Sequence, residues 1–180
     1  MFVLGLDPGL TRCGYSVLEQ RAGERPRAVA LGVLRTAPAD PVPARLAELQ
    51  RELRSLFDDY QPVALAVERV LFQVNVRTAM SVGQASGVAM AEAASRGCVV
   101  EQYSPNEVKQ AVTGYGAATK EQVQMMVQTL LGLAELPKPA DAADAAALAL
   151  CHLARMPMAR AAAAAGHRAD PGADHDGLVR

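Results

Sequence analysis

Four carboxylates stand at positions that suggest chemistry. Asp7 and Glu68 each end a short apolar run (FVLGL and VALAV), whereas Asp141 and Asp144 are three residues apart in an alanine-rich segment. An unpaired ionised carboxylate at the end of an apolar strand costs several kcal/mol unless something positive compensates it. We therefore expect a cation near Asp7.

These carboxylates predict a site for hard divalent cations, provided that they converge. On a helix, Asp141 and Asp144 lie about 60° apart, on the side that is buried further along the helix. Clustered carboxylates cannot all stay ionised without cations. Their oxygen atoms suit Mg²⁺ or Mn²⁺. Two such ions, about 3.5 to 4 Å apart, can hold the attacking water and the leaving oxygen of an in-line phosphodiester displacement.

Each signal taken alone has an ordinary explanation. The Asp-Pro-Gly sequence at Asp7 is typical of a turn, and Glu68 could pair with Arg69. Asp141 could be a helix N-cap, and Asp144 a first-turn acid that the helix dipole favours. Only the combination of the four indicates metal chemistry.

The apolar periodicity predicts the elements that must position these acids. Two capping-box patterns, which begin at Ser104 and Thr119, predict two helix starts. Strands are expected at residues 2–7, 14–19, 28–34, 63–67 and 99–103, and helices at 42–60, 77–96, from 105, from 119 to about 133, and from 141 to about 156. The order predicts an α/β sandwich: a mixed sheet of about five strands, the first three an antiparallel meander, with helices on both faces.

Length and composition favour one domain, residues 1–156, followed by a low-complexity C-terminal tail, residues 157–180, in which we expect no chemistry. No apolar run is long enough to span a membrane, and three distant cysteines without a CxxC pair favour a reducing cytoplasm. The formal net charge of −1 would become +3 with two bound divalent ions, a modest attraction for a polyanion.

The helix expected at residues 77–96 carries Gly83, Gly87 and Ala91 four apart on one side. Small residues on one face let another helix approach closely. The sequence leaves open whether this face packs under the sheet or forms a dimer contact.

Six short motifs carry a family resemblance: Leu4-Gly-Leu-Asp-Pro-Gly9 with Gly14-Tyr15, Ala66-Val-Glu-Arg-Val70, Gly83-Gln-Ala-Ser-Gly87, Val108-Lys109-Gln110, the Gly-Tyr-Gly loop before Lys120, and Ala140-Asp-Ala-Ala-Asp-Ala145. With these motifs the chain resembles the RuvC family of Holliday junction resolvases, which are homodimeric endonucleases of the ribonuclease H-like superfamily. The likeness runs from Phe2 to about His152, and it implies a ribonuclease H-like fold for the predicted sheet and helices.

The resemblance implies roles for residues that the pattern alone leaves ordinary. Asp7, Glu68, Asp141 and Asp144 would hold two Mg²⁺ ions, with Mn²⁺ as a substitute. Asp7 would bridge both ions, Glu68 and Asp144 would bind one each, and Asp141 would complete or orient the shell. Lys109 and Lys120 would contact the scissile phosphate region.

The resemblance also implies a four-way DNA junction as substrate, nicked symmetrically in recombination and repair to leave 3′-hydroxyl and 5′-phosphate ends. Leu71 or Phe72 would probe the junction centre, Arg77 would contact DNA, and Gly83 with Gly87 would form the dimer contact. The partners implied are a second copy of the chain and a branch-migration complex of the RuvA and RuvB type.

Three rival functions differ in what they require. An actin-like nucleotide phosphotransferase needs two such domains around its nucleotide, and this chain has length for one. A ribonuclease H-like enzyme that processes ribosomal RNA precursors shares the opening strand but differs in its last acidic motif. A junction-binding scaffold without catalysis would not need all four carboxylates.

Overall fold

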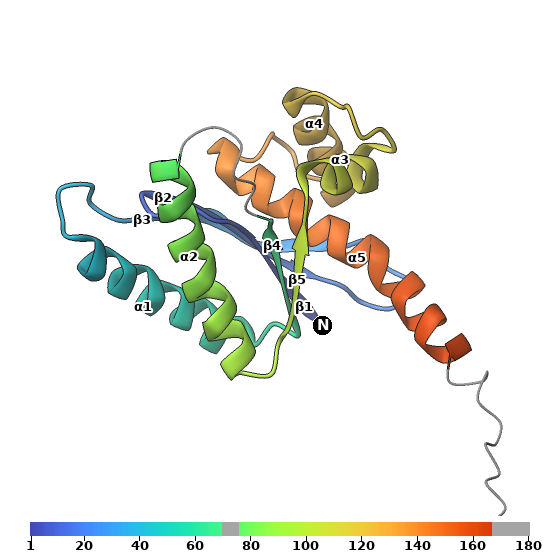
Figure 1. Ribbon diagram of the computed structural model, residues 1–180. Helices are drawn as coiled ribbons and strands as arrows, with labels where there is room; N and C mark the ends of the chain where they lie inside the picture. Colours follow the sequence, from blue (N-terminus) through green and yellow to red (C-terminus); the bar gives the residue numbers. More distant parts are fainter. Residues whose placement is uncertain (70–75, 167–180) are drawn as a thin grey trace, which may run out of the picture.

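The computed structural model describes residues 1–69 and 76–166 of the chain (Figure 1). Its elements follow the predicted order: β1 (Phe2–Asp7), β2 (Arg12–Glu19), β3 (Arg27–Arg35), α1 (Val42–Tyr60), β4 (Ala64–Glu68), α2 (Val76–Ser95), β5 (Val99–Tyr103), α3 (Pro105–Thr113), α4 (Lys120–Leu131) and α5 (Ala140–Gly166).

One five-stranded sheet has the order β3-β2-β1-β4-β5. The pairs β1–β2 and β2–β3 are antiparallel, whereas β1–β4 and β4–β5 are parallel. The predicted mixed sheet with an antiparallel meander is therefore confirmed. Helices α1 and α2 cover one face, and α5 crosses the other with α3 and α4 beside it (Figure 1).

Strand alternation decides which face each catalytic candidate occupies. Leu4 and Leu6 of β1 pack with α1 and α2, whereas Val3 packs with α5. Because successive side chains point to opposite faces of a sheet, Asp7 lies on the α5 face. The same alternation in β4 puts Glu68 on that face, since Ala66 packs with α5.

Glycines in the strands let α5 approach the sheet closely. A Cβ on Gly5 would come 2.0 Å from the carbonyl oxygen of Ala145, and one on Gly14 would come 2.2 Å from that of Asp141. The Ser16 hydroxyl donates a hydrogen bond to the same Ala145 oxygen at 2.9 Å. The first turns of α5 are therefore fixed against β1 and β2.

Helix α2 buries Ala85, Ala89 and Ala93 against the sheet. Its glycine face is a different one, because a Cβ on Gly83 or Gly87 would meet nothing within 4 Å in the described part of the chain. The sequence left open whether this glycine face packs under the sheet or forms a dimer contact. Packing of the glycine face under the sheet is thereby excluded.

Both predicted capping boxes are present, at Ser104 with Glu107 and at Thr119 with Gln122. Helix α5 is longer than predicted and continues from about Met156 to Gly166. Alanine has the highest helix propensity of all residues, so an alanine-rich segment extends a helix without apolar periodicity. No helix within the described residues has the length and apolar character needed to cross a membrane.

Candidate active site

Asp7 and Glu68 end two neighbouring parallel strands. The register pairs Leu6 with Val67, so the next positions along β1 and β4 are Asp7 and Glu68. Their carboxyl groups lie close enough for hydrogen bonding between them to affect both pKa values. The sequence prediction that these two acids meet is therefore consistent with the described geometry.

Burial makes this pair of carboxyls hard to ionise. Burial, followed by the charges of Glu68, Asp144 and Asp141, raises the pKa of Asp7 to about 7. Burial also raises the pKa of Glu68, although the hydrogen bond with Asp7 and the charge of Lys120 oppose that shift. A cation at this place would stabilise the ionised forms.

The other two acids carry cationic partners. Lys120, the first residue of α4, places Nζ 2.6 Å from Oδ2 of Asp144, and this contact raises the pKa of Lys120. Arg12, the first residue of β2, donates to Oδ2 of Asp141 through Nε at 3.0 Å and also through Nη2.

A pocket of about 470 Å³ brings the chemistry together. Three of the four predicted carboxylates and both predicted lysines line it. The lining side chains are Asp7, Glu68, Asp144, Lys109, Lys120, Pro105, Val108, Val123, Ala147 and Leu148. Asp141 is not among them. Two of the chain's three lysines are thus found beside the carboxylates.

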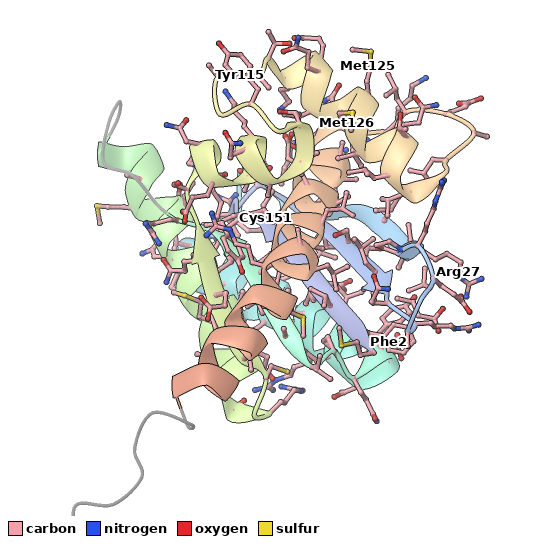
Figure 2. All side chains as sticks on the ribbon, turned by 90° about the vertical axis from the view of Figure 1, so that its right-hand side faces the viewer. Phe2, Arg27, Tyr115, Met125, Met126 and Cys151 are labelled. Carbon is pink, nitrogen blue, oxygen red and sulfur yellow. The ribbon has the colours of Figure 1, made fainter. Side chains whose placement is uncertain are left out.

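Helices α3 and α4 close this pocket on one side. Figure 2 shows Tyr115, in the loop between α3 and α4, and Met125 of α4 at the end of the molecule opposite Phe2, the first residue of β1. Strand β1 therefore runs toward these helices and ends there in Asp7. Glu107 of α3 forms an ion pair with Arg155 of α5, with 2.9 Å between Glu107 Oε1 and Arg155 Nη1. This pair ties the helix that carries Lys109 to the helix that carries Asp144.

The residues fit a divalent cation in their donor chemistry. Asp7, Glu68 and Asp144 offer hard carboxylate oxygens in one pocket, and the raised pKa of Asp7 reflects its burial first and then the neighbouring negative charges. Within the described residues no three His, Cys, Asp or Glu side chains have the spacing of a preformed metal site. Arg12 and Lys120 now hold two of the four acids.

Sequence reasoning did not identify two arginines, of which one holds Asp141 and the other orders the turn after Asp7. One is Arg12. The other is Arg45 of α1, a buried guanidinium whose Nε and Nη2 donate to the hydroxyls of Thr36 at 2.9 Å and Thr11 at 2.7 Å. The Thr36 hydroxyl in turn donates to the Leu10 carbonyl at 2.5 Å. No local pattern marks such contacts, because they join residues distant in sequence.

Some predicted DNA contacts cannot be compared with the structure. Leu71 and Phe72 lie outside the described residues. Arg77 lies in the first turn of α2, and its side chain is not among those described.

The strand order, with acids at the ends of β1 and β4 and on the last helix, defines a ribonuclease H-like nuclease. The yeast mitochondrial Holliday junction resolvase Ydc2 shares the fold, with a TM-score of 0.64 at 14% identity, over 92% of this chain and 85% of that one.

The family follows from closer similarities. The family model of the crossover junction endodeoxyribonuclease RuvC matches residues 3–152. The crossover junction endodeoxyribonuclease RuvC of Salinispora arenicola is 51% identical over 172 residues, covering 96% of this chain and 98% of the relative. That of Frankia alni is 54% identical over 166 residues, covering 92% and 84%.

A solved structure agrees with these relatives. Thermus thermophilus RuvC, in complex with a Holliday junction substrate, superposes with a TM-score of 0.84 at 36% identity, over 88% of this chain and 96% of that one. The chain belongs to the RuvC family of crossover junction endodeoxyribonucleases, which are metal-dependent nucleases acting on DNA.

Proposed function

We propose that this chain resolves four-way DNA junctions by hydrolysing one phosphodiester bond in each of two strands of like polarity. The observation that carries the proposal is the pocket in which Asp7, Glu68 and Asp144 meet Lys109 and Lys120, in a chain of the RuvC family. The Thermus relative, solved with a Holliday junction, supports the substrate.

The three pocket carboxylates would hold two Mg²⁺ ions, or Mn²⁺ in their place. Asp7 would contribute to both ions, and Glu68 and Asp144 to one each. Bound ions of this kind polarise an attacking water and stabilise the leaving oxygen. The products are 3′-hydroxyl and 5′-phosphate ends that a ligase can seal.

The two lysines would bind the scissile phosphate. Lys109 and Lys120 project from separate helices into the pocket. Ammonium groups held there are preorganised for the negative charge that develops on phosphate oxygens. The contact of Lys120 with Asp144 keeps its ammonium group beside the proposed metal ligands, which supports this role.

The substrate has two equivalent strands, so we propose a two-fold homodimer with one pocket per subunit. The open face of α2 at Gly83 and Gly87 is our candidate contact. Leu71 or Phe72, together with Arg77, would contact DNA near the junction centre. The enzyme would act in the cytoplasm, in recombination and repair, with a branch-migration complex of the RuvA and RuvB type.

The test is cleavage of a labelled mobile four-way junction in Mg²⁺ or Mn²⁺, compared with duplex DNA and structured RNA. We expect paired symmetric nicks in the junction alone. Asp7→Asn should bind the junction and leave it uncut. Full cleavage by this variant would contradict the metal assignment, and preferential cleavage of RNA would redirect the proposal to RNA processing.

A further inference from the structure

Arg12 holds Asp141 from a neighbouring strand. Both Nε and Nη2 of its guanidinium donate to one carboxylate oxygen of Asp141, and the two residues are 129 apart in the sequence. The side chain of Arg12 is 41% exposed and that of Asp141 is 28% exposed. An ion pair in contact with water is weak enough for another cation to displace it.

The backbone around this pair is fixed, so only side chains can change partners. The Asp141 carbonyl lies against Gly14 of β2, with no room for a side chain between them. The Ala145 carbonyl one turn later accepts a hydrogen bond from Ser16 of the same strand. Arg12 begins this strand, and the carboxylate it holds is therefore attached to a helix turn that packs directly on β2.

Asp141 is near the pocket without lining it. Its charge contributes to the raised pKa of Asp7, and Asp144, one turn further along α5, lines the pocket. The Asp141 carboxylate is thus held by Arg12 while it remains within electrostatic range of the acids that line the pocket.

A second feature of β2 favours this pairing. The sheet register puts Arg12 directly opposite Arg35 of β3. Like charges at directly opposite positions destabilise a sheet. Asp141 neutralises one of the two cations, and Arg35 makes no ion pair with it in the described part of the chain.

We propose that Arg12 is a positioning residue that competes with a divalent cation for Asp141. In the metal-free protein Arg12 holds Asp141 out of the pocket. When ions occupy the pocket, Asp141 exchanges Arg12 for the more weakly bound ion. This inference rests on the proposed function, because it requires divalent ions at Asp7, Glu68 and Asp144.

The experiment is Mn²⁺ titration of the full chain without DNA, followed by electron paramagnetic resonance. Arg12→Ala should raise the affinity for the weaker ion about threefold, as expected for loss of a competing surface ion pair. Arg35→Ala is the matched control, since it removes the same charge at the opposite position of the sheet without touching Asp141. It should change the affinity by less than about 1.5-fold.

The Asp141→Asn background separates positioning from general charge. In this background, Arg12→Ala should change the affinity for the weaker Mn²⁺ ion no more than Arg35→Ala does. The inference would be overturned by an equal effect of the two arginine variants in the wild-type background, or by an undiminished effect of Arg12→Ala in the Asp141→Asn background. Arg12→Gln provides a second variant if Arg12→Ala does not fold, which thermal unfolding checks.

Failure of the proposed function has a different signature. If Asp7→Asn binds Mn²⁺ as the wild type does, the ions are not in this pocket and the proposed function fails. If Asp7→Asn loses binding while Arg12→Ala behaves as Arg35→Ala, only the competition between Arg12 and the ion is wrong.

Discussion

Gly14 of β2 lies against the Asp141 carbonyl of α5 with no space for a side chain: a Cβ at Gly14 would come 2.2 Å from that oxygen. The contact sets the distance between the sheet and the helix turn that carries Asp141 and Asp144. A glycine that appears in the sequence as an interruption of a strand therefore positions the candidate site.

Gly14→Ala should destabilise the protein, because either α5 or β2 must move to make room for the methyl group. Overpacking of this kind costs about 1 to 3 kcal/mol of unfolding free energy. Urea unfolding in the presence of EDTA measures it. Gly116→Ala is the control, since its Cβ would make only ordinary contact, 3.6 Å from Gln110 Oε1. Equal stability of the two variants would contradict the assigned contact.

The elements were predictable because their signals are local. Capping boxes at Ser104 and Thr119 mark helix starts within four residues, and apolar alternation marks strands. Glycine weakens a strand interior and so indicates close approach of another segment, but neither Gly5 nor Gly14 indicates which segment approaches. That information depends on the packing of α5, which no local pattern contains.

The candidate site, too, was predictable only as far as its signals are local. The types and spacing of Asp7, Glu68 and Asp144 indicated a common pocket, and the structure brings them together. Asp141 carries the same signal as Asp144, yet its partner is Arg12, 129 residues away. Helix periodicity defines a direction to within tens of degrees, which does not distinguish a pocket from the arginine beside it.

Asp7 should reduce stability at neutral pH when no metal is present. Its folded pKa of about 7 lies above the ordinary 3.8, so the native state binds a proton that the unfolded state has lost. Stability therefore falls as pH rises from about 4 to about 7. Above pH 7, metal-free Asp7→Asn should be more stable than wild type by on the order of 2 kcal/mol.

Urea unfolding from pH 5 to pH 8 measures this difference, with and without Mg²⁺. Mg²⁺ should stabilise the wild type, because an ion that binds only the native state shifts unfolding by mass action, and should have less effect on Asp7→Asn. Exposed Asp40 provides the control substitution, Asp40→Asn. A loss of stability in metal-free Asp7→Asn at pH 8 would disprove the account that burial and neighbouring charges make ionised Asp7 unfavourable.

His152 should give a pH dependence of the opposite sign. It is buried, with Nδ1 2.8 Å from the Tyr103 hydroxyl, and burial lowers its pKa. The unfolded state then binds a proton more readily, so stability is full above the ordinary pKa of 6.5 and is lost as pH falls through the folded value. His152→Gln should remove this pH dependence. The difference between the unfolding free energies of the wild type and the variant, measured as a function of pH, isolates it.

Lys120 should matter for cleavage more than for folding. Replacing it with Met removes a positive group from the pocket and should lower the rate of junction cleavage about 100-fold, as for loss of a preorganised donor. Lys138→Met is the matched control, because Lys138 is exposed and does not line the pocket. Single-turnover cleavage in saturating enzyme measures the rate without the binding step, and equal rates for the two variants would remove Lys120 from the site.

Gly87 should be required for pairing of two subunits if the open face of α2 is the dimer contact. We expect Gly87→Leu to fold, since nothing described lies within 4 Å of its Cβ position, and the larger side chain should hold a second helix away. We expect a dimeric wild type and a folded, monomeric variant in sedimentation velocity, with paired nicks replaced by single ones. Ser55→Leu, on the exposed side of α1, should remain dimeric. A Gly87→Leu variant that dimerises as tightly as wild type would place the contact elsewhere, because two helices cannot pack closely over an inserted leucine.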